Sequence, residues 1–283
     1  MRAGHCHGSG IALWATDGPT QSYDGEWDSG KRHGVGVWKS YQWTYDGQWD
    51  SDRWHGQGAW TTRAGERYDG QWESGIKHGQ GAWRSPAGER YDGQWDSGNK
   101  HGKGVWTTRA GERYDGQWDS GNKHGRGCVW TTSTGERYEG QYESGKRHGQ
   151  GVWTTSTGES YEGQWESGKR HGQGVWKSRE GTYAGQWDSG KRHGQGAWTN
   201  CYGGRYKGQW DSDKKHGYGI WMDGSKTYDG QWQSDLKHGC GVWASRAGEK
   251  YAGQWRFGEH HGEGVWSTRA GESYDGQWDS GKR

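Results

Sequence analysis

The sequence contains few aliphatic residues. Its 283 residues include 58 Gly, 25 Trp and 16 Tyr, whereas all hydrophobic types together make up only 27%. A core of packed Leu, Ile and Val is therefore excluded, so a folded core must be aromatic. Low hydrophobicity with many charges is typical of disorder, but disordered chains are poor in aromatic residues. The composition therefore favours a folded protein.

The sequence also lacks an excess of charge of one sign. There are 37 basic and 35 acidic residues, and the two kinds alternate along the chain. Such a chain builds no large field of one sign, which nucleic-acid binding would require. We therefore expect no nucleic-acid partner.

Long apolar runs and a regular cysteine framework are missing too. The N-terminus MRAGHCHGSGIALW has one short apolar run, too short for a signal peptide, and no segment approaches the length of a membrane span. The four cysteines lie out of phase with the repeat described below, at Cys6, Cys128, Cys201 and Cys240. They resemble free thiols of a reducing compartment. We expect a cytoplasmic protein, which could associate with the cytoskeleton or a membrane.

What the sequence does contain is a repeat of 22 to 24 residues. The pattern Tyr-x-Gly-x-aromatic begins at Tyr23, Tyr45, Tyr68, Tyr91, Tyr114, Tyr138, Tyr161, Tyr183, Tyr206, Tyr228, Tyr251 and Tyr274. His-Gly-x-Gly follows each of the first eleven starts. No linker interrupts the period, which predicts a single repeat array over residues 1–283. It would contain eleven complete hairpins over 23–266, with half-repeats at 7–14 and 274–283.

Each unit has the pattern of a β-hairpin. Alternation places Tyr23, Gly25 and Trp27 on one face of a strand, and Gly30 in the following DSGKR segment can adopt a positive φ. We expect Tyr23 to face Trp38, Gly25 to face Gly36, and Trp27 to face Gly34. Glycine would then leave slots in which aromatic rings lie. The predicted fold is all-β: an elongated, single-layer antiparallel β-meander of tandem hairpins, twisted and open-ended.

Both ends of this meander would expose strand edges. Unpaired edges attract other strands, so we expect the ends to contact a neighbouring chain, to be capped, or to mark the limits of a longer protein.

The repeat resembles a known family. Tyr-Asp/Glu-Gly-x-Trp, then Gly-Lys-x-His-Gly-x-Gly, then Gly-x-x-Tyr, is similar to the MORN (membrane occupation and recognition nexus) repeat over about residues 7 to 283. Departures are local: Asp52, Asp213 and Asp235 replace the turn glycine, Tyr142 replaces the strand Trp, and Cys128 is an extra residue that we interpret as a β-bulge.

Catalysis and metal binding are not expected. Successive His residues of the repeat would lie about 10 Å apart by the strand spacing, too far to share a zinc ion. The terminal cluster of His5, Cys6 and His7 is too short to form a site by itself. A carboxylate at the position of Asp24, which would pair with Glu26 in the first unit, recurs in most units, whereas an active site needs unique surroundings. We predict no enzyme, no catalytic residues, no cofactor and no metal.

The resemblance implies two hypotheses about function. The first is a scaffold, which the occurrence of the family in ciliary radial spokes, junctophilins and cytoskeletal assemblies suggests. A protein partner, as a helix or extended segment, would bind an aromatic surface. Its candidate residues are Tyr41, Trp43, Trp54, Tyr68, Trp72, Tyr91 and Trp95. The first three depart from the repeat, and alternatively they only cover a shorter unit.

The second hypothesis is peripheral binding to anionic phospholipid, either phosphoinositide or phosphatidic acid, because the family occurs in plant phosphatidylinositol phosphate kinases. Near an anionic membrane, each cation at a hairpin turn can contribute about 1 kcal/mol. The candidate residues are Lys146, Arg147, Lys169, Arg170, Lys191 and Arg192. The alternative is that these cations form an ordinary solvated face.

Overall fold

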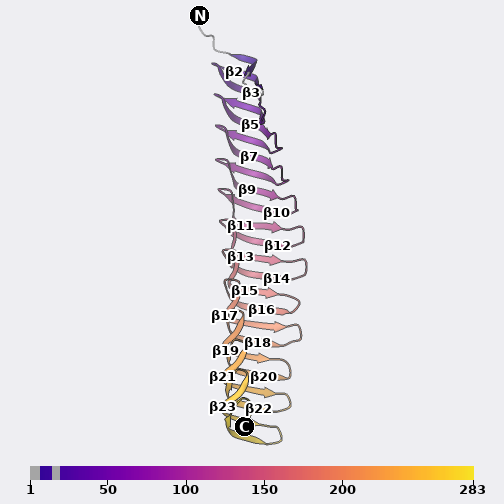
Figure 1. Ribbon diagram of the computed structural model, residues 1–283, viewed down its shortest axis with the longest axis vertical. Helices are drawn as coiled ribbons and strands as arrows, with labels where there is room; N and C mark the ends of the chain where they lie inside the picture. The colour runs from indigo at the N-terminus through magenta and orange to yellow at the C-terminus, as the bar shows by residue number, and fades with distance from the viewer. Residues whose placement is uncertain (1–6, 15–19) are drawn as a thin grey trace. The chain divides into compact units, whose positions relative to one another are not determined.

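The structure, a computed structural model, describes residues 7–14 and 20–283. Across these residues every regular element is a β-strand (Figure 1). In the part of the chain described, no helix is long and apolar enough to cross a membrane. The predicted all-β class is therefore confirmed.

The chain divides into two compact units, residues 1–146 and 147–283. The strands of the first unit are β1 (Gly8–Trp14), β2 (Gln21–Asp28), β3 (Lys31–Lys39), β4 (Trp43–Asp50), β5 (Arg53–Thr62), β6 (Arg67–Glu73), β7 (Ile76–Arg84), β8 (Arg90–Asp96), β9 (Asn99–Thr107), β10 (Arg113–Asp119), β11 (Asn122–Thr131) and β12 (Arg137–Glu143).

The strands of the second unit are β13 (Lys146–Thr154), β14 (Ser160–Glu166), β15 (Lys169–Lys177), β16 (Gly181–Asp188), β17 (Lys191–Asn200), β18 (Arg205–Asp211), β19 (Lys214–Met222), β20 (Lys226–Gln233), β21 (Leu236–Ser245), β22 (Lys250–Arg256), β23 (Glu259–Ser267) and β24 (Ser273–Trp278). Within each unit, every strand pairs antiparallel with its neighbours in sequence. Each unit is thus a meander of hairpins, as predicted.

The hairpin turns force the backbone into left-handed conformations. In the first, Ser29 and Gly30 have φ of 50° and 79°, the signs required by a type I′ turn, which suits the twist of paired strands. The predicted positive φ at Gly30 is confirmed. Serine precedes the turn glycine in most units, because a small residue is the least costly non-glycine choice there after Asn and Asp.

The predicted register is right in one half of the hairpin and wrong in the other. Tyr23 faces Trp38 and Gly25 faces Gly36, but Trp27 faces Arg32 instead of Gly34. A bulge at His-Gly-x-Gly shifts the pairing by two residues, and Gly34 pairs with Trp49 of the next hairpin instead. The same shift recurs in the other hairpins whose pairing the structure describes, except that the hairpin with the extra residue Cys128 shifts by three residues.

A glutamine side chain fills this bulge. In the second hairpin, Gln48 Oε1 accepts a hydrogen bond from the backbone N–H of Gln57 at 2.7 Å. Gly56 has a φ of 54°, and a Cβ added there would overlap the Gln48 carboxamide. The carboxamide therefore takes the place of a ladder hydrogen bond, which explains why Gln recurs in Tyr-Asp-Gly-Gln-Trp and glycine in His-Gly-x-Gly.

The tyrosines form the buried centre of every hairpin. Tyr68 has no exposed surface, and its ring lies over Gly81, where an added Cβ would overlap the ring. The Tyr68 hydroxyl donates to the carbonyl of Gln71 at 2.9 Å. Burial raises the pKa of Tyr23 and Tyr161 to about 12. The prediction that strand glycines leave slots for rings is confirmed.

Cys128 confirms the predicted irregularity of its unit. The extra residue moves Cys128, not Gly127, opposite Gly140, and a register shift lies between Gly125 and Cys128. Its buried thiol lies where other units have glycine, with Sγ 3.2 Å from the carbonyl of His124.

The slot can be tested with two matched glycines. Gly81→Ala should destabilise the protein by about 1–3 kcal/mol, because the methyl group overpacks against the Tyr68 ring. Gly10→Ala should have little effect, because Gly10 occupies the same place in its repeat but an added Cβ there meets only Trp27 atoms at 3.9 Å. Thermal unfolding followed by circular dichroism measures both. Equal losses in the two variants would contradict the slot.

Candidate functional site

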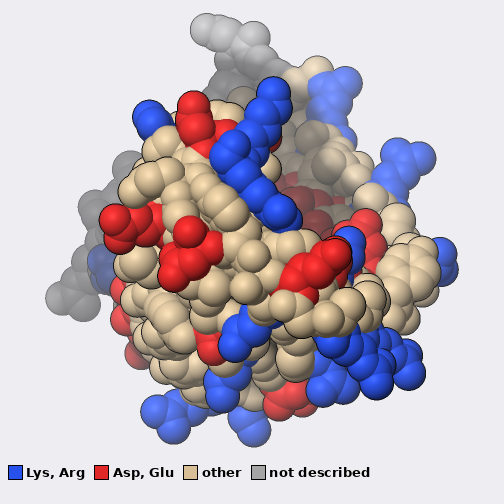
Figure 2. Space-filling view, turned by 90° about the horizontal axis from the view of Figure 1, so that it is seen from below, with Lys and Arg blue, Asp and Glu red and all other residues tan. Residues whose placement is uncertain are grey.

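Alternation along the strands gives each hairpin two different faces. One carries the buried Tyr and Trp of Tyr-x-Gly-x-Trp, together with the Trp that ends the second strand. We call it the aromatic face. The other carries Gln, Ala, Val and charged side chains, and it is hollowed by about 730 Å³ in the second unit around Gln173, Val175 and Ala197. Lysine and arginine mix with acidic residues over the surface seen in Figure 2.

Aromatic contacts connect each hairpin to the next on the aromatic face. Tyr23 meets Trp27 edge-to-face at 5.1 Å between ring centroids, and meets Trp49 of the next hairpin at 5.3 Å. The indole of Trp49 donates back to the carbonyl of Gly36 at 2.9 Å. Edge-to-face pairs contribute about 0.5–1.5 kcal/mol beyond the area they bury. Within each unit, most repeat tyrosines touch an aromatic ring of their own strand and one of the next hairpin, so a hairpin alone has an incomplete core.

A row of cations lies between these rings. The residue before each repeat His faces the Trp of the preceding strand, as Lys77 faces Trp72. Lys77 Nζ lies 5.2 Å from the Tyr68 ring and 5.1 Å from the Trp95 ring, which are cation–π distances. We call these residues the cation column: Arg32, Lys77, Lys100 and Lys123 in the first unit, and Arg147, Arg170, Arg192, Lys215 and Lys237 in the second. Burial lowers the pKa of Lys77, Lys100 and Lys215.

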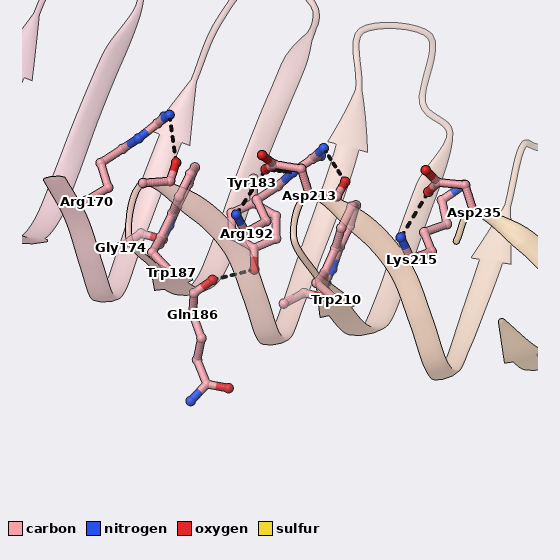
Figure 3. Close-up of polar contacts among 12 residues, drawn as sticks. Arg170, Gly174, Tyr183, Gln186, Trp187, Arg192, Trp210, Asp213, Lys215 and Asp235 are labelled. Carbon is pink, nitrogen blue, oxygen red and sulfur yellow. Dashed lines mark hydrogen bonds and ion pairs between the residues drawn. The ribbon is translucent and has the colours of Figure 1, made fainter. Parts of the chain in front are cut away.

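The residues predicted to bind lipid fall into two groups, exposed lysines at the turns and arginines of the cation column. Lys146, Lys169 and Lys191 are exposed at the turns. Their neighbours fold over indole rings instead: Arg147 over Trp165 at 5.2 Å, Arg170 over Trp187 at 4.2 Å and Arg192 over Trp210 at 4.3 Å (Figure 3). Lipid binding stays a prediction, and the turns would present mainly the lysines to a membrane.

The three aspartates that replace the turn glycine join neighbouring hairpins. Asp213, with a φ of 71°, accepts hydrogen bonds on Oδ1 from the backbone N–H and Nε of Arg192, at 3.0 and 3.1 Å (Figure 3). Its own N–H donates to the Arg192 carbonyl at 3.0 Å. A glycine turn lacks the carboxylate bonds: between Gly190 and Arg170 there remain the bond from the Gly190 N–H to the Arg170 carbonyl and one from Arg170 Nη2 to the Gly190 carbonyl, at 3.2 Å (Figure 3). The sequence showed the departure, but the partner became clear only from the stacking of hairpins.

The structure brings two predicted binding residues together. Trp43 meets Trp54 edge-to-face at 5.2 Å and stacks on Trp38 at 5.9 Å. Trp38 also contacts Trp14, at 5.2 Å, and Trp14 is 38% exposed. We call Trp14, Trp38, Trp43 and Trp54 the tryptophan cluster. Sequence reasoning missed Trp14 and Trp38, because only the strand pairing shows that their rings adjoin Trp43.

Trp54 takes the place of a cation in the column. It stacks on the buried ring of Tyr45 with centroids 4.7 Å apart and planes at 6°. Nine hairpins place Lys or Arg at this position, and one places His260, which stacks on Tyr251. The cluster contains one unsatisfied donor, because the buried Nε1–H of Trp38 has no hydrogen-bond partner among the residues described. Here an indole replaces the cation over Tyr45, and the aromatic face is partly exposed at Trp14.

The remaining predicted binding residues lie in different surroundings. Tyr41 is 57% exposed, with the Arg63 guanidinium 4.1 Å over its ring. Tyr68, Trp72, Tyr91 and Trp95 are buried. Their rings form the support of the aromatic face, so only their edges can touch a partner.

The histidines of the repeat lie at the turns. His78 Nδ1 is 3.5 Å from the Asp96 carboxylate of the next hairpin, and His33 is placed likewise beside Asp50. Within 7–14 and 20–283, no group of three His, Cys, Asp or Glu residues could hold a metal ion. His5 and Cys6 lie outside the described residues, whereas His7 contacts Asp28 at 3.0 Å.

The repeat units of the chain match a known family of proteins. The family model described as the MORN repeat matches residues 23–44, 45–67, 68–90, 91–113, 114–133, 138–160, 161–182, 183–199, 206–226, 228–249 and 251–271. No curated protein matches the chain. Among solved structures, the selenomethionine-substituted virginiamycin B lyase from Staphylococcus aureus matches 88% of this chain and 85% of its own, at 10% identity and a TM-score of 0.16. A similarity that low carries no argument.

The aspartate contacts make stability depend on pH. Burial opposes ionisation of Asp52, but hydrogen bonds from the backbone and side chain of Arg32 hold the pKa of that carboxyl below its usual value. A depressed folded pKa stabilises above the unfolded pKa of about 3.9, and this contribution disappears as the pH falls through the folded value.

Asp52→Asn should therefore cost up to about 1 kcal/mol at pH 7, since the pair is partly exposed, and progressively less below pH 4. Asp46→Asn, at an exposed site on the other face, is the control. Urea unfolding at a series of pH values measures the difference. A loss for Asp52→Asn that stays constant down to pH 2 would argue against an ionic contact.

Proposed function

The chain belongs to the MORN-repeat family, and we propose that it is a non-catalytic scaffold that binds a protein partner at its tryptophan cluster. The observation that supports this most is the break in the cation column at Trp54. In nine hairpins the column residue is Lys or Arg and covers Tyr and Trp rings with charge, and in the β22–β23 hairpin it is His260, which stacks on Tyr251. At Trp54 an indole covers the Tyr45 ring instead, and Trp14 and Tyr41 are exposed nearby.

The surroundings of the cluster indicate the chemistry of the partner. The Arg32 guanidinium lies 4.9 Å over the Trp38 ring, and Arg63 lies over Tyr41. Cations therefore border an apolar centre. Buried aromatic anchors dominate protein interfaces, while charges at the rim determine which partner approaches. The partner that fits is a helix or extended segment with an apolar anchor flanked by acidic residues.

The matched variant is Trp54→Lys, because lysine occupies this column position in other units and should preserve the fold. A library of displayed peptides is selected on the full wild-type chain, and the enriched peptides are measured by calorimetry. We expect apolar, acidic sequences that bind Trp54→Lys at least thirtyfold more weakly, which corresponds to the loss of one anchor worth about 2 kcal/mol.

Gln80→Lys, which adds the same charge on the other face, should bind as the wild type does. If enriched peptides bind the wild type and Trp54→Lys alike, the tryptophans only cover a short repeat. Co-sedimentation with anionic vesicles at low and high salt tests the other candidate. Salt-sensitive binding lost on changing Lys146, Lys169 and Lys191 to Gln would favour a membrane instead.

A further inference from the structure

A second opening on the aromatic face lies within the second unit. It has a volume of about 520 Å³ between β19 and β23. Its walls include four indoles: Trp221, Trp232, Trp243 and Trp255. Trp232 and Trp255 are buried, while Trp221 and Trp243 are half-buried. We call this opening the Lys237 pocket, after the column residue that lines it. Its volume is typical of small-molecule sites.

The pocket departs from the repeat at one charge. Two residues before the repeat Tyr, seven of the twelve units have a glutamate and one has a lysine. Glu66 accepts a hydrogen bond from the Trp83 indole at 2.7 Å, and Glu159 accepts one from Trp176 at the same distance. The Glu66 charge also favours the protonated form of Lys77. The corresponding residue here is Lys226, which lines the pocket and has no acceptor to offer Trp243.

Positive charge exceeds negative charge in the pocket, because Lys215, Lys226 and Lys237 line it with one carboxylate, Asp223. Lys237 Nζ lies 4.4 Å from the Trp255 ring and 5.2 Å from the Tyr228 ring. Asp235 offsets the charge of Lys215, and Asp223, which accepts from the backbone N–H groups of Ser225 and Lys226, offsets that of Lys226. Lys237 is the lysine of the pocket whose charge no carboxylate offsets among the described residues.

The pKa of the Lys237 amine reflects this excess of positive charge. Burial, assisted by the charge of Lys226, lowers the pKa of Lys237 to about 8. Burial also lowers the pKa of His260, with a contribution from Lys237. Lysines elsewhere in the column have a carboxylate to offset burial, as Lys77 has Glu66.

We propose that the Lys237 pocket binds a flat aromatic anion, a ring that carries one carboxylate or phosphate group. The ring would lie against the indoles, and the anionic group would face Lys226 and Lys237. Offset or edge-to-face contacts favour an aromatic ring over an aliphatic body. The bound anion would take the place of the glutamate that other units supply. Its attraction to the Lys237 amine is stronger than in water, because the amine is partly desolvated.

Binding should take up a proton. An anion beside Lys237 favours its charged form, and near pH 8 about half of the amine is neutral in the free protein. Complete protonation would therefore absorb up to about half a proton per ligand at that pH. Simple adsorption to indole rings predicts no such uptake.

The probe is 2-naphthoate, titrated into the full chain by calorimetry at pH 8 in two buffers of different ionisation enthalpy. We expect one saturable site with proton uptake. Acetate, which has the charge without the ring, and 2-naphthalenemethanol, which has the ring without the charge, should each bind at least tenfold more weakly. Absence of saturable binding by 10 mM naphthoate, or equal binding of the neutral alcohol, would overturn the proposal.

The sharpest variant restores the residue of the other units. Lys226→Glu should weaken naphthoate binding at least tenfold without lowering the thermal transition, because glutamate occupies this position in seven repeats, including the next one at Glu249. Lys250→Glu makes the same charge change at an exposed site of the adjacent strand, outside the pocket, and should bind normally. Lys237→Gln should abolish the proton uptake. Equal weakening by the Lys226 and Lys250 variants would reduce the effect to net charge and refute the site. Phenyl phosphate should bind at the same site with the same dependence on Lys226, and binding that Lys226→Glu leaves unchanged would contradict the phosphate part of the proposal.

Discussion

The structure of each hairpin depends on a tyrosine ring that lies flat over paired glycines. Tyr68 has room only because Gly70 and Gly81 lack side chains, and its hydroxyl reaches the Gln71 carbonyl only because the ring lies that close to the strand. This one contact determines the pairing of Tyr with Trp in the facing strand. It also accounts for glycine inside strands, where it normally costs stability.

The second constraint is that the aromatic core is built between hairpins and not within them. A Tyr contacts its own Trp and the Trp of the next hairpin, whose indole donates to a strand carbonyl. The column residue then covers both rings with a charged or polar end and a methylene stem. The methylene stems of charged residues thus cover the aromatic rings, as aliphatic side chains do in an ordinary core. This is how so polar a sequence can fold.

Sequence reasoning reached the fold because the period of two is explicit in Tyr-x-Gly-x-Trp, and the turn residues mark each hairpin. It failed at Trp27 and Gly34, because a bulge has no signature in simple alternation. The Gln in Tyr-Asp-Gly-Gln-Trp was the available signal, but its meaning depends on the N–H it satisfies across the strand. The column cations looked like a solvated edge for the same reason. If the bulge had been included, alternation counted from the turn would have placed the column cations on the aromatic face.

Once each repeat position has a structural task, departures separate into two kinds. Asp213 and Cys128 still perform the task of the residue they replace, since one keeps the left-handed turn and the other keeps a small buried group opposite glycine. Trp54 and Lys226 do not. Trp54 removes a charge from the aromatic face, and Lys226 adds one where a carboxylate belongs. Each change alters the charge of the aromatic face relative to the other repeats, so the surface chemistry that each creates is where specific function is to be sought.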